Sequence, residues 1–192
     1  STPAATGTDS DALSEFFGGE TDARLQALSG VLSSFACAVQ TYPEVLTSLP
    51  DENFGWTYLY NLIVYNGVTC DGVTASRDGF SVTEDAVSTL QRSTLGGAMW
   101  SGVGDALSDY VTFDEKRGSY DIKTGRPQSL GAYIESAAYR EDVSCAELTV
   151  AVYDASLNTD LASAVVSRYC IDLRAHENSP YGYVIMAFSR AE

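Results

Sequence analysis

Apolar residues recur at helical spacing early in this chain and alternate at strand spacing near its end. From Thr21 to Val39 they return every three or four positions, so they line one face of a helix of about five turns. Pro43 and Pro50 bracket a short segment, which we expect to form one or two helical turns. The pattern therefore predicts a long amphipathic helix followed by a short one.

A second helical pattern lies in a region rich in aromatic residues. Asn53 is a candidate N-cap, and Asn66-Gly67 is a suitable stop signal. The run Tyr58–Tyr65 is also compatible with one strand of a hairpin that turns at Asn66-Gly67. Further along, Thr83 is a candidate N-cap of a helix that continues to about Ser93, because two acidic residues follow it at the positive end of the helix.

The middle of the chain has weaker signals. A helix is predicted from Ala98 to Val111, although Gly102 and Gly104 disfavour it. Residues 112–128 are polar and rich in turn-forming residues, so they predict a long connection. Ser129 is a candidate cap of a short helix that extends through Tyr139.

The clearest strand patterns come late. Between Cys145 and Tyr153, apolar and polar or small residues alternate, and Ala162 to Leu173 gives a second strand. The two predict an antiparallel pair. Ser179-Pro180 then has the cap-and-proline sequence that opens a helix, which predicts a helix at the end of the chain. Helices followed by strands predict the α+β class.

Composition limits the classes of partner. The chain has 26 acidic and 11 basic residues and a formal net charge of −15, so it is expected to repel nucleic acid and anionic membranes. Hydrophobic residues make up 45% of it, which predicts a folded domain. We place one extracellular domain at residues 12–192, after a flexible leader at residues 1–11. A membrane association is expected only through a lipid anchor on a longer precursor.

Four widely spaced cysteines suggest a compartment. Cys37, Cys70, Cys145 and Cys170 lack the short spacing of a zinc or redox motif. An even, sparse set is typical of two disulfides in a secreted or surface domain. Three connectivities are possible, and we favour Cys37–Cys70 and Cys145–Cys170.

Few residues suggest catalysis. His176 is the single histidine, so it would have to serve any Ser-His-Asp or Cys-His site, and no nucleophile motif accompanies it. No phosphate-binding glycine loop occurs, and we expect no cofactor and no metal. Acidic residues are numerous enough for a glycosidase-like carboxylate pair to arise by chance. Among the twelve tyrosines, Tyr139, Tyr181 and Tyr183 are candidates for protein recognition.

The C-terminal third resembles a known family. Ala137-Ala138-Tyr139, Val143-Ser144-Cys145-Ala146, the segment Ala164 to Cys170 and Ser179-Pro180-Tyr181 are together similar to the Eimeria-type coccidian surface antigens. The resemblance covers Tyr133 to Glu192. It implies a three-layer α-β-α sandwich like that of the CAP superfamily, display on a parasite cell surface by a GPI anchor, attachment to host cells and recognition by host immunity.

Two hypotheses follow. The first is a non-enzymatic, extracellular surface antigen with two disulfides, whose partner is a host-cell surface protein or glycan. The second is a secreted effector or small secreted hydrolase that uses a carboxylate pair. A hydrolase requires a cleft in which two acids converge, whereas a recognition domain requires an exposed aromatic or charged patch.

Overall fold

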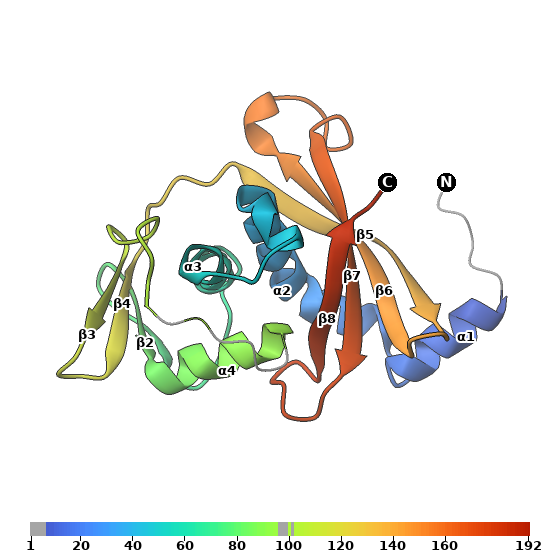
Figure 1. Ribbon diagram of the computed structural model, residues 1–192, viewed down its shortest axis with the longest axis horizontal. Helices are drawn as coiled ribbons and strands as arrows, with labels where there is room; N and C mark the ends of the chain where they lie inside the picture. The colour runs from blue at the N-terminus through green and yellow to red at the C-terminus, as the bar shows by residue number, and fades with distance from the viewer. Residues whose placement is uncertain (1–6, 96–99, 101) are drawn as a thin grey trace.

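The computed structural model describes residues 7–95, 100 and 102–192 and has the predicted α+β class. Two four-stranded antiparallel sheets lie at opposite sides, with helices α2 (Thr21–Thr41), α3 (Glu52–Tyr60) and α4 (Glu84–Leu95) between them (Figure 1). Residues 1–6 of the predicted leader lie outside the described part, and from Gly7 to Phe16 the chain forms helix α1. Among the described residues, no helix has both the length and the apolar composition needed to span a bilayer.

The predicted long helix is confirmed as α2 (Thr21–Thr41). Its apolar face is buried against β5 and β6 of the second sheet, and Leu32 and Phe35 are fully buried there. Phe35 also meets Phe54 edge to face, with ring centroids 5.6 Å apart. The short segment after Pro43 is a 3-10 helix, η1 (Pro43–Leu46). Helix α2 therefore packs between the second sheet and helix α3.

The aromatic region is helical, so the hairpin alternative is wrong. Helix α3 (Glu52–Tyr60) begins at Asp51, whose carboxylate accepts a hydrogen bond from the backbone N–H of Phe54 at 3.0 Å. Asn53 is therefore not the cap, and its Oδ1 instead accepts from the N–H of Ala106 at 3.1 Å. The chain continues directly into a π-helix, η2 (Asn61–Tyr65), which ends at Asn66.

The first sheet has the strand order β1 (Val73–Ala75), β2 (Gly79–Thr83), β4 (Ser119–Lys123) and β3 (Val111–Asp114). Helix α4 (Glu84–Leu95) follows β2, and Thr83 caps it as predicted, because its Oγ1 accepts from the N–H of Ala86 at 3.2 Å. The helix predicted for residues 98–111 is wrong in its described part: residues 102–110 form turns before β3. Residues 96–99 and 101 lie outside the described part. The predicted polar connection contains the β3–β4 hairpin.

The second sheet contains β5 (Leu130–Arg140), β6 (Cys145–Asp154), β7 (Val165–Ala175) and β8 (Tyr183–Arg190) in chain order. The predicted antiparallel pair is confirmed as β6 and β7. Two predicted helices are wrong, because residues 130–140 form β5 and the end of the chain forms β8. Ser179 does not open a helix: its Oγ accepts from the N–H of Tyr181 at 3.2 Å within a turn that leads into β8.

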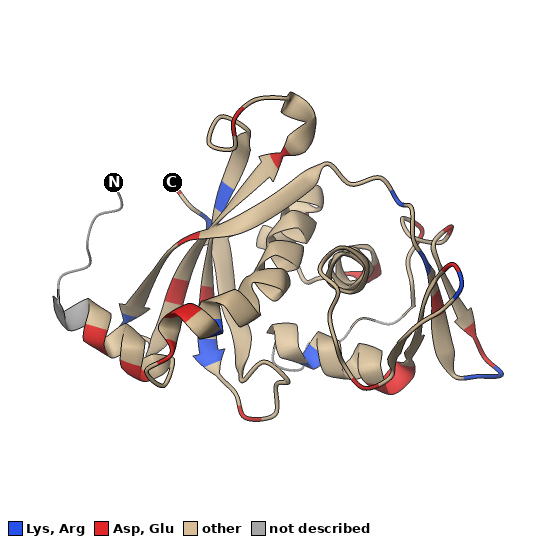
Figure 2. Cartoon of the chain, turned by 180° about the vertical axis from the view of Figure 1, so that it is seen from behind, with Lys and Arg blue, Asp and Glu red and all other residues tan. Residues whose placement is uncertain are grey.

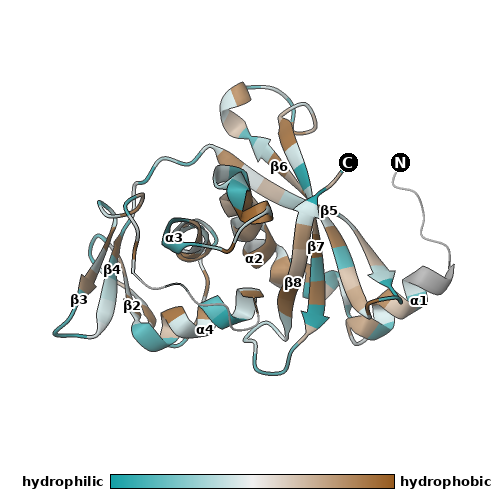
Figure 3. Ribbon diagram, viewed as in Figure 1, coloured by the Kyte–Doolittle hydropathy of each residue, from teal (hydrophilic) through white to brown (hydrophobic). Residues whose placement is uncertain are grey.

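One face of the second sheet packs against the helices. Leu148 and Val150 point to that face and are fully buried, whereas Glu147 and Thr149 alternate with them on the opposite face. Figure 3 shows this alternation of hydrophobic and hydrophilic residues along the strands. On the opposite face Ala138, Arg168 and Ser189 are exposed. That face is therefore a solvent-accessible surface of the molecule.

Both predicted disulfides are wrong, because all four cysteines are free and far apart. Thr149, not Cys145, lies opposite Cys170, so Cys145 is four residues away along β6, or about 13 Å. Cα atoms of a disulfide lie within about 7 Å of each other. On the other side of the sheet, a Cβ on Gly30 would lie 3.3 Å from Asn66, which places the chain that leads to Cys70 beside Gly30. Cys37 is seven residues further along α2, or about 10 Å.

The free cysteines remove one argument about compartment. The expectation of secretion drew on a disulfide framework, and this framework does not exist in the structure. An extracellular location now depends only on the resemblance of the C-terminal third.

Candidate functional site

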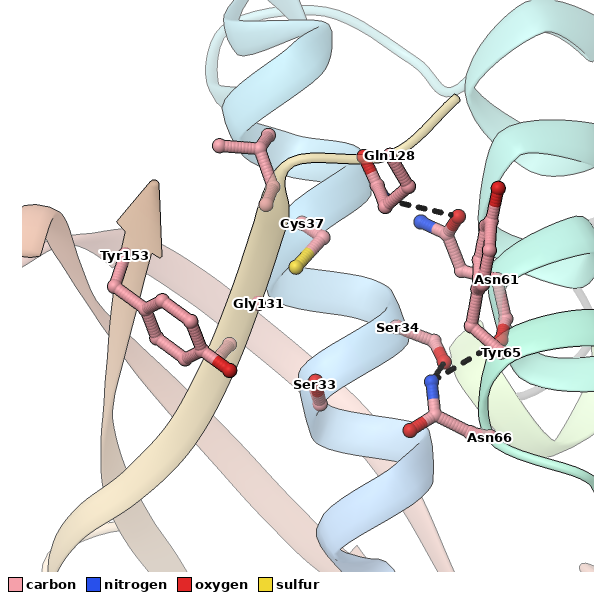
Figure 4. Close-up of a pocket in the computed structure, with 11 residues that line it drawn as sticks. Ser33, Ser34, Cys37, Asn61, Tyr65, Asn66, Gln128, Gly131 and Tyr153 are labelled. Carbon is pink, nitrogen blue, oxygen red and sulfur yellow. Dashed lines mark hydrogen bonds between the residues drawn. The ribbon is translucent and has the colours of Figure 1, made fainter. Parts of the chain in front are cut away.

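A polar cavity of about 230 Å³ lies where α2, η2 and the start of β5 meet (Figure 4). Its lining comes from four separate parts of the chain and consists of Ser33, Ser34, Cys37, Asn61, Tyr65, Asn66, Gln128, Leu130, Gly131, Ala132 and Tyr153. None of these side chains is charged at neutral pH, because the thiol of a cysteine and the phenol of a tyrosine ordinarily lose their protons only at higher pH. The cavity is therefore polar but electrically neutral.

The π-helix positions one wall of the cavity. π-Helical turns are rare and occur frequently at functional sites. Two tyrosines hold the segment between β4 and β5 against this turn. Tyr60 donates a hydrogen bond to the carbonyl of Lys123 at 2.7 Å, and the hydroxyl of Tyr65 donates one to the carbonyl of Arg126. These bonds bring Gln128 next to η2.

Asn61 is the most constrained residue of this wall. It is 2% exposed, and its Oδ1 accepts a hydrogen bond from Nε2 of Gln128 at 3.2 Å. Its Nδ2 has no hydrogen-bond partner among the residues that the structure describes, and Figure 4 shows this nitrogen directed toward the cavity and Cys37. A buried donor without an acceptor costs about 1–3 kcal/mol. The cavity therefore presents a donor that an oxygen atom of a ligand would satisfy.

The opposite wall is formed by α2. Ser34 is 1% exposed, and its Oγ accepts from Nδ2 of Asn66 at 2.7 Å. Burial raises the pKa of the Cys37 thiol to about 12, and a hydrogen bond with Ser33 opposes this rise only in part. Cys37 is therefore protonated at neutral pH and is not an active nucleophile. This geometry suits binding rather than covalent chemistry.

A second cluster lies on the exposed face of the second sheet. Arg140 contacts three carboxylates: Asp142 at 2.8 Å, Glu147 at 3.4 Å and Asp172 at 3.7 Å. Burial raises the pKa of Asp172, and the neighbouring charge of Glu147 raises it further. Sequence reasoning could not find this carboxylate pair, because it depends on the register of β6 and β7. The periodicity predicted both strands but not which residues face each other.

The connection between β6 and β7 stands away from the body of the protein at the top of Figure 1, and Figure 2 shows it in the same position from behind. It contains the 3-10 helix η3 (Ala155–Leu157) and the left-handed residue Asn158. We call residues 155–164 the β6–β7 tip. Leu157 and Leu161 are both 51% exposed on it.

Two aspartates fix the shape of the β6–β7 tip. Oδ1 of Asp154 accepts from the N–H of Ser156 at 2.9 Å, and Oδ1 of Asp160 accepts from the N–H of Ser163 at 3.0 Å. These hydrogen bonds, together with those from the serine hydroxyls, lower the pKa of both carboxylates. The tip is therefore a structured loop that presents two leucines beside two negative charges.

The three tyrosines proposed for recognition lie at different depths. Tyr183 is 8% exposed and packs on Phe16, with ring centroids 5.3 Å apart. Tyr139 is half-buried and also lies near Phe16, at 6.0 Å. Tyr181 lines another cavity of about 390 Å³ with Cys70, and its hydroxyl is buried without a partner. Its pKa is raised, chiefly by burial. All three tyrosines are therefore at least partly buried, and none of them belongs to the β6–β7 tip.

His176 lies in the turn between β7 and β8, where its Nδ1 is buried and has no partner. Within residues 7–95, 100 and 102–192, no group of three His, Cys, Asp or Glu residues is arranged to hold a metal ion. Comparison of the chain with protein-family models, with curated protein sequences and with solved structures found no match.

Proposed function

We propose that this protein is a non-enzymatic recognition domain that binds a protein on the surface of a host cell through the β6–β7 tip. The observation that carries the proposal is the projection of Leu157 and Leu161, each 51% exposed, from a loop fixed by hydrogen bonds. A structured loop loses little conformational entropy on binding, which favours affinity. The complementary surface would be an apolar pocket.

The charge of the β6–β7 tip indicates the character of that pocket. Asp154 and Asp160 flank the leucines, and residues 154–164 contain no Lys or Arg. The whole chain carries a formal net charge of −15, which accelerates encounter with a basic surface. We therefore expect a partner with an apolar pocket that is rimmed by basic residues.

The assignment to a surface antigen rests on the resemblance of Tyr133–Glu192 to the Eimeria-type family. The helix that the resemblance expects after Ser179-Pro180 is absent from the described structure, because this segment leads into β8. Display at the cell surface, a GPI anchor, recognition by host immunity and a CAP-like sandwich remain predictions from this resemblance.

The proposal is tested by removing the two leucines. Fluorescently labelled protein would be added to cultured epithelial cells, and bound protein would be measured by flow cytometry for the wild type and for Leu157→Ser/Leu161→Ser. We expect the double variant to lose at least tenfold in apparent affinity. Leu49→Ser is the matched control, because Leu49 is 89% exposed on a different loop. Equal binding by all three proteins would refute a role of the tip.

Protease treatment of the cells separates the two kinds of partner. If the partner is a protein, mild trypsin treatment should abolish the binding that depends on the leucines. Binding that survives trypsin but disappears after removal of glycans would assign the tip to a glycan and would overturn this part of the proposal.

The hydrolase alternative has one observation in its favour, the facing carboxylates Glu147 and Asp172 with a raised pKa on Asp172. Against it, the pair lies on a strand face and is bridged by Arg140 at 3.4 and 3.7 Å. Hydrolysis of chromogenic glycosides that disappears in both Glu147→Gln and Asp172→Asn would favour this alternative. Activity that is absent, or that persists in both variants, would exclude this pair.

A further inference from the structure

We infer that the polar cavity beside η2 binds a neutral, hydroxyl-rich ligand with the size of a single sugar ring. This inference is independent of the β6–β7 tip, which lies in another part of the molecule and contributes no residue to the cavity. It assigns a ligand class to a site that the proposed protein–protein contact does not use.

The hydrogen-bonding groups of the cavity require a ligand that accepts and donates. Nδ2 of Asn61 is a buried donor without an acceptor, and it points into the cavity (Figure 4). Ser33 and Tyr153 also line the cavity, and a hydroxyl of either residue can accept or donate a hydrogen bond. A sugar hydroxyl does both, so a ring with several hydroxyls can satisfy the donor of Asn61 and bond to the protein hydroxyls together.

The electrostatics of the cavity favour a neutral ligand. No Asp, Glu, Lys, Arg or His is among the described residues that line it, so a charged ligand would lose its hydration without gaining an opposite charge. A volume of about 230 Å³ lies below the range of roughly 300–1,000 Å³ that drug-sized ligands occupy. Tyr65 and Tyr153 lie at opposite sides of the cavity in Figure 4 and offer aromatic surface to the C–H groups of a sugar ring.

The cavity is maintained by specific packing. Gly131 lies on β5 directly opposite Tyr153 on β6, and a Cβ at Gly131 would overlap the Tyr153 ring and hydroxyl. The absence of a side chain at residue 131 therefore allows the Tyr153 hydroxyl to reach the cavity. On the other side, the hydrogen bond from Gln128 holds the Asn61 amide in the orientation that directs Nδ2 inward.

Binding would be measured by NMR titration of the full chain with glucose, galactose, mannose and N-acetylglucosamine, and with the anionic sugar N-acetylneuraminic acid. We expect at least one neutral sugar to shift the side-chain amide resonances of Asn61. Asn61→Asp retains the oxygen that accepts from Gln128 but replaces the donor with a charged oxygen. It should weaken binding at least tenfold.

Two further variants keep the test decisive if Asn61→Asp does not fold. Gly131→Ala should also weaken binding, because it displaces Tyr153 and leaves Asn61 intact. Gln91→Glu is the matched control: Gln91 is a buried amide at 3% exposure with an unpartnered Oε1, but it lines a different cavity. We expect it to bind the sugar like the wild type.

Three outcomes would overturn the inference. The first is the absence of any shift with neutral sugars up to about 50 mM, which corresponds to a binding free energy of about 2 kcal/mol at the 1 M standard state. The second is a response to the anionic sugar alone. The third is equal weakening of binding by Gln91→Glu and by the two cavity variants.

Discussion

Glu147 on β6 lies directly opposite Asp172 on β7, so two carboxylates face each other across neighbouring strands. Like charges at such a position destabilise a sheet. Arg140 offsets part of this repulsion, because its Nη1 lies 3.4 Å from Glu147 and 3.7 Å from Asp172. The raised pKa of Asp172 shows that burial and Glu147 outweigh Arg140. The ionised form of Asp172 is therefore less favourable in the folded protein than in the unfolded chain.

Asp172→Asn should raise the melting temperature at pH 7. Removal of a facing like charge stabilises by roughly 0.2–1 kcal/mol, which corresponds to about 0.4–4 °C for a domain of this size. The folded pKa of Asp172 lies above 3.8, the ordinary value for an aspartate, so its ionisation reduces stability above the folded pKa. The difference between variant and wild type should therefore shrink as the pH falls through the folded pKa and vanish below 3.8. Calorimetry between pH 3 and pH 8 measures it.

Asp142→Asn is the control for this experiment. Asp142 bonds to the same Arg140, but that bond lowers its pKa, so the charge is favourable in the fold. Its removal should lower the melting temperature, with an effect that is lost as the pH falls through the lowered pKa. A decrease for both variants would show that Arg140 dominates both carboxylates.

The cysteines should be free thiols in the purified protein. Alkylation with iodoacetamide in denaturant, without reductant, should label Cys37, Cys70, Cys145 and Cys170, because none has a sulfur partner. In the native state Cys37 and Cys145 should react most slowly, because they are 3% and 2% exposed, and burial also raises the pKa of the Cys37 thiol to about 12. Peptide mass mapping measures both results. Disulfide-linked peptides would contradict the structure.

Elements whose burial follows one regular period were predictable from sequence. α2 carries its large apolar residues at helical spacing, and β6 carries them at every second position from Leu148 to Val152. β8 was not predictable in this way, because Ser179-Pro180 has the local signal of a helix start. Its strand conformation depends on hydrogen bonds to β7, a partner that local signals do not reveal. β5 likewise depends on pairing with β6, which outweighs the helical preference of its alanines.

The cavity beside η2 was missed for a related reason. Its walls combine residues near positions 33, 61, 128 and 153, which no short motif connects. The aromatic run Tyr58–Tyr65 left helix and strand open, and a π-turn gives no distinct period over five residues. The uncharged Asn61 also offered no chemical signal. An unpartnered buried amide becomes visible only when the tertiary contacts are known.

Gly55→Ala should destabilise the fold through the contact of α3 with Trp100. A Cβ at Gly55 would overlap the indole ring of Trp100, and both residues are buried. Overpacking of this kind costs about 1–3 kcal/mol, against a gain of about 1 kcal/mol in helix propensity. Urea denaturation should therefore show a lower midpoint with an unchanged slope.

Gly30→Ala is the matched control within another helix. Its new Cβ would lie 3.3 Å from Cβ of Asn66, a tight contact that a shift of a few tenths of an ångström relieves. The gain in helix propensity should then leave stability unchanged or increased. Equal destabilisation by both variants would show that the contact with Trp100 is not the cause.

The buried hydroxyls of Tyr181 and Tyr169 should respond in opposite ways to removal. Tyr181 has no hydrogen-bond partner, so Tyr181→Phe should leave the free energy of unfolding unchanged or increase it. Tyr169 donates to Oε1 of Gln40 at 2.6 Å and so links β7 to α2, and Tyr169→Phe should cost about 1 kcal/mol and leave Gln40 unpaired. Urea denaturation of both variants measures the contrast. A loss of stability in Tyr181→Phe as large as that in Tyr169→Phe would mean that the Tyr181 hydroxyl has a partner in solution.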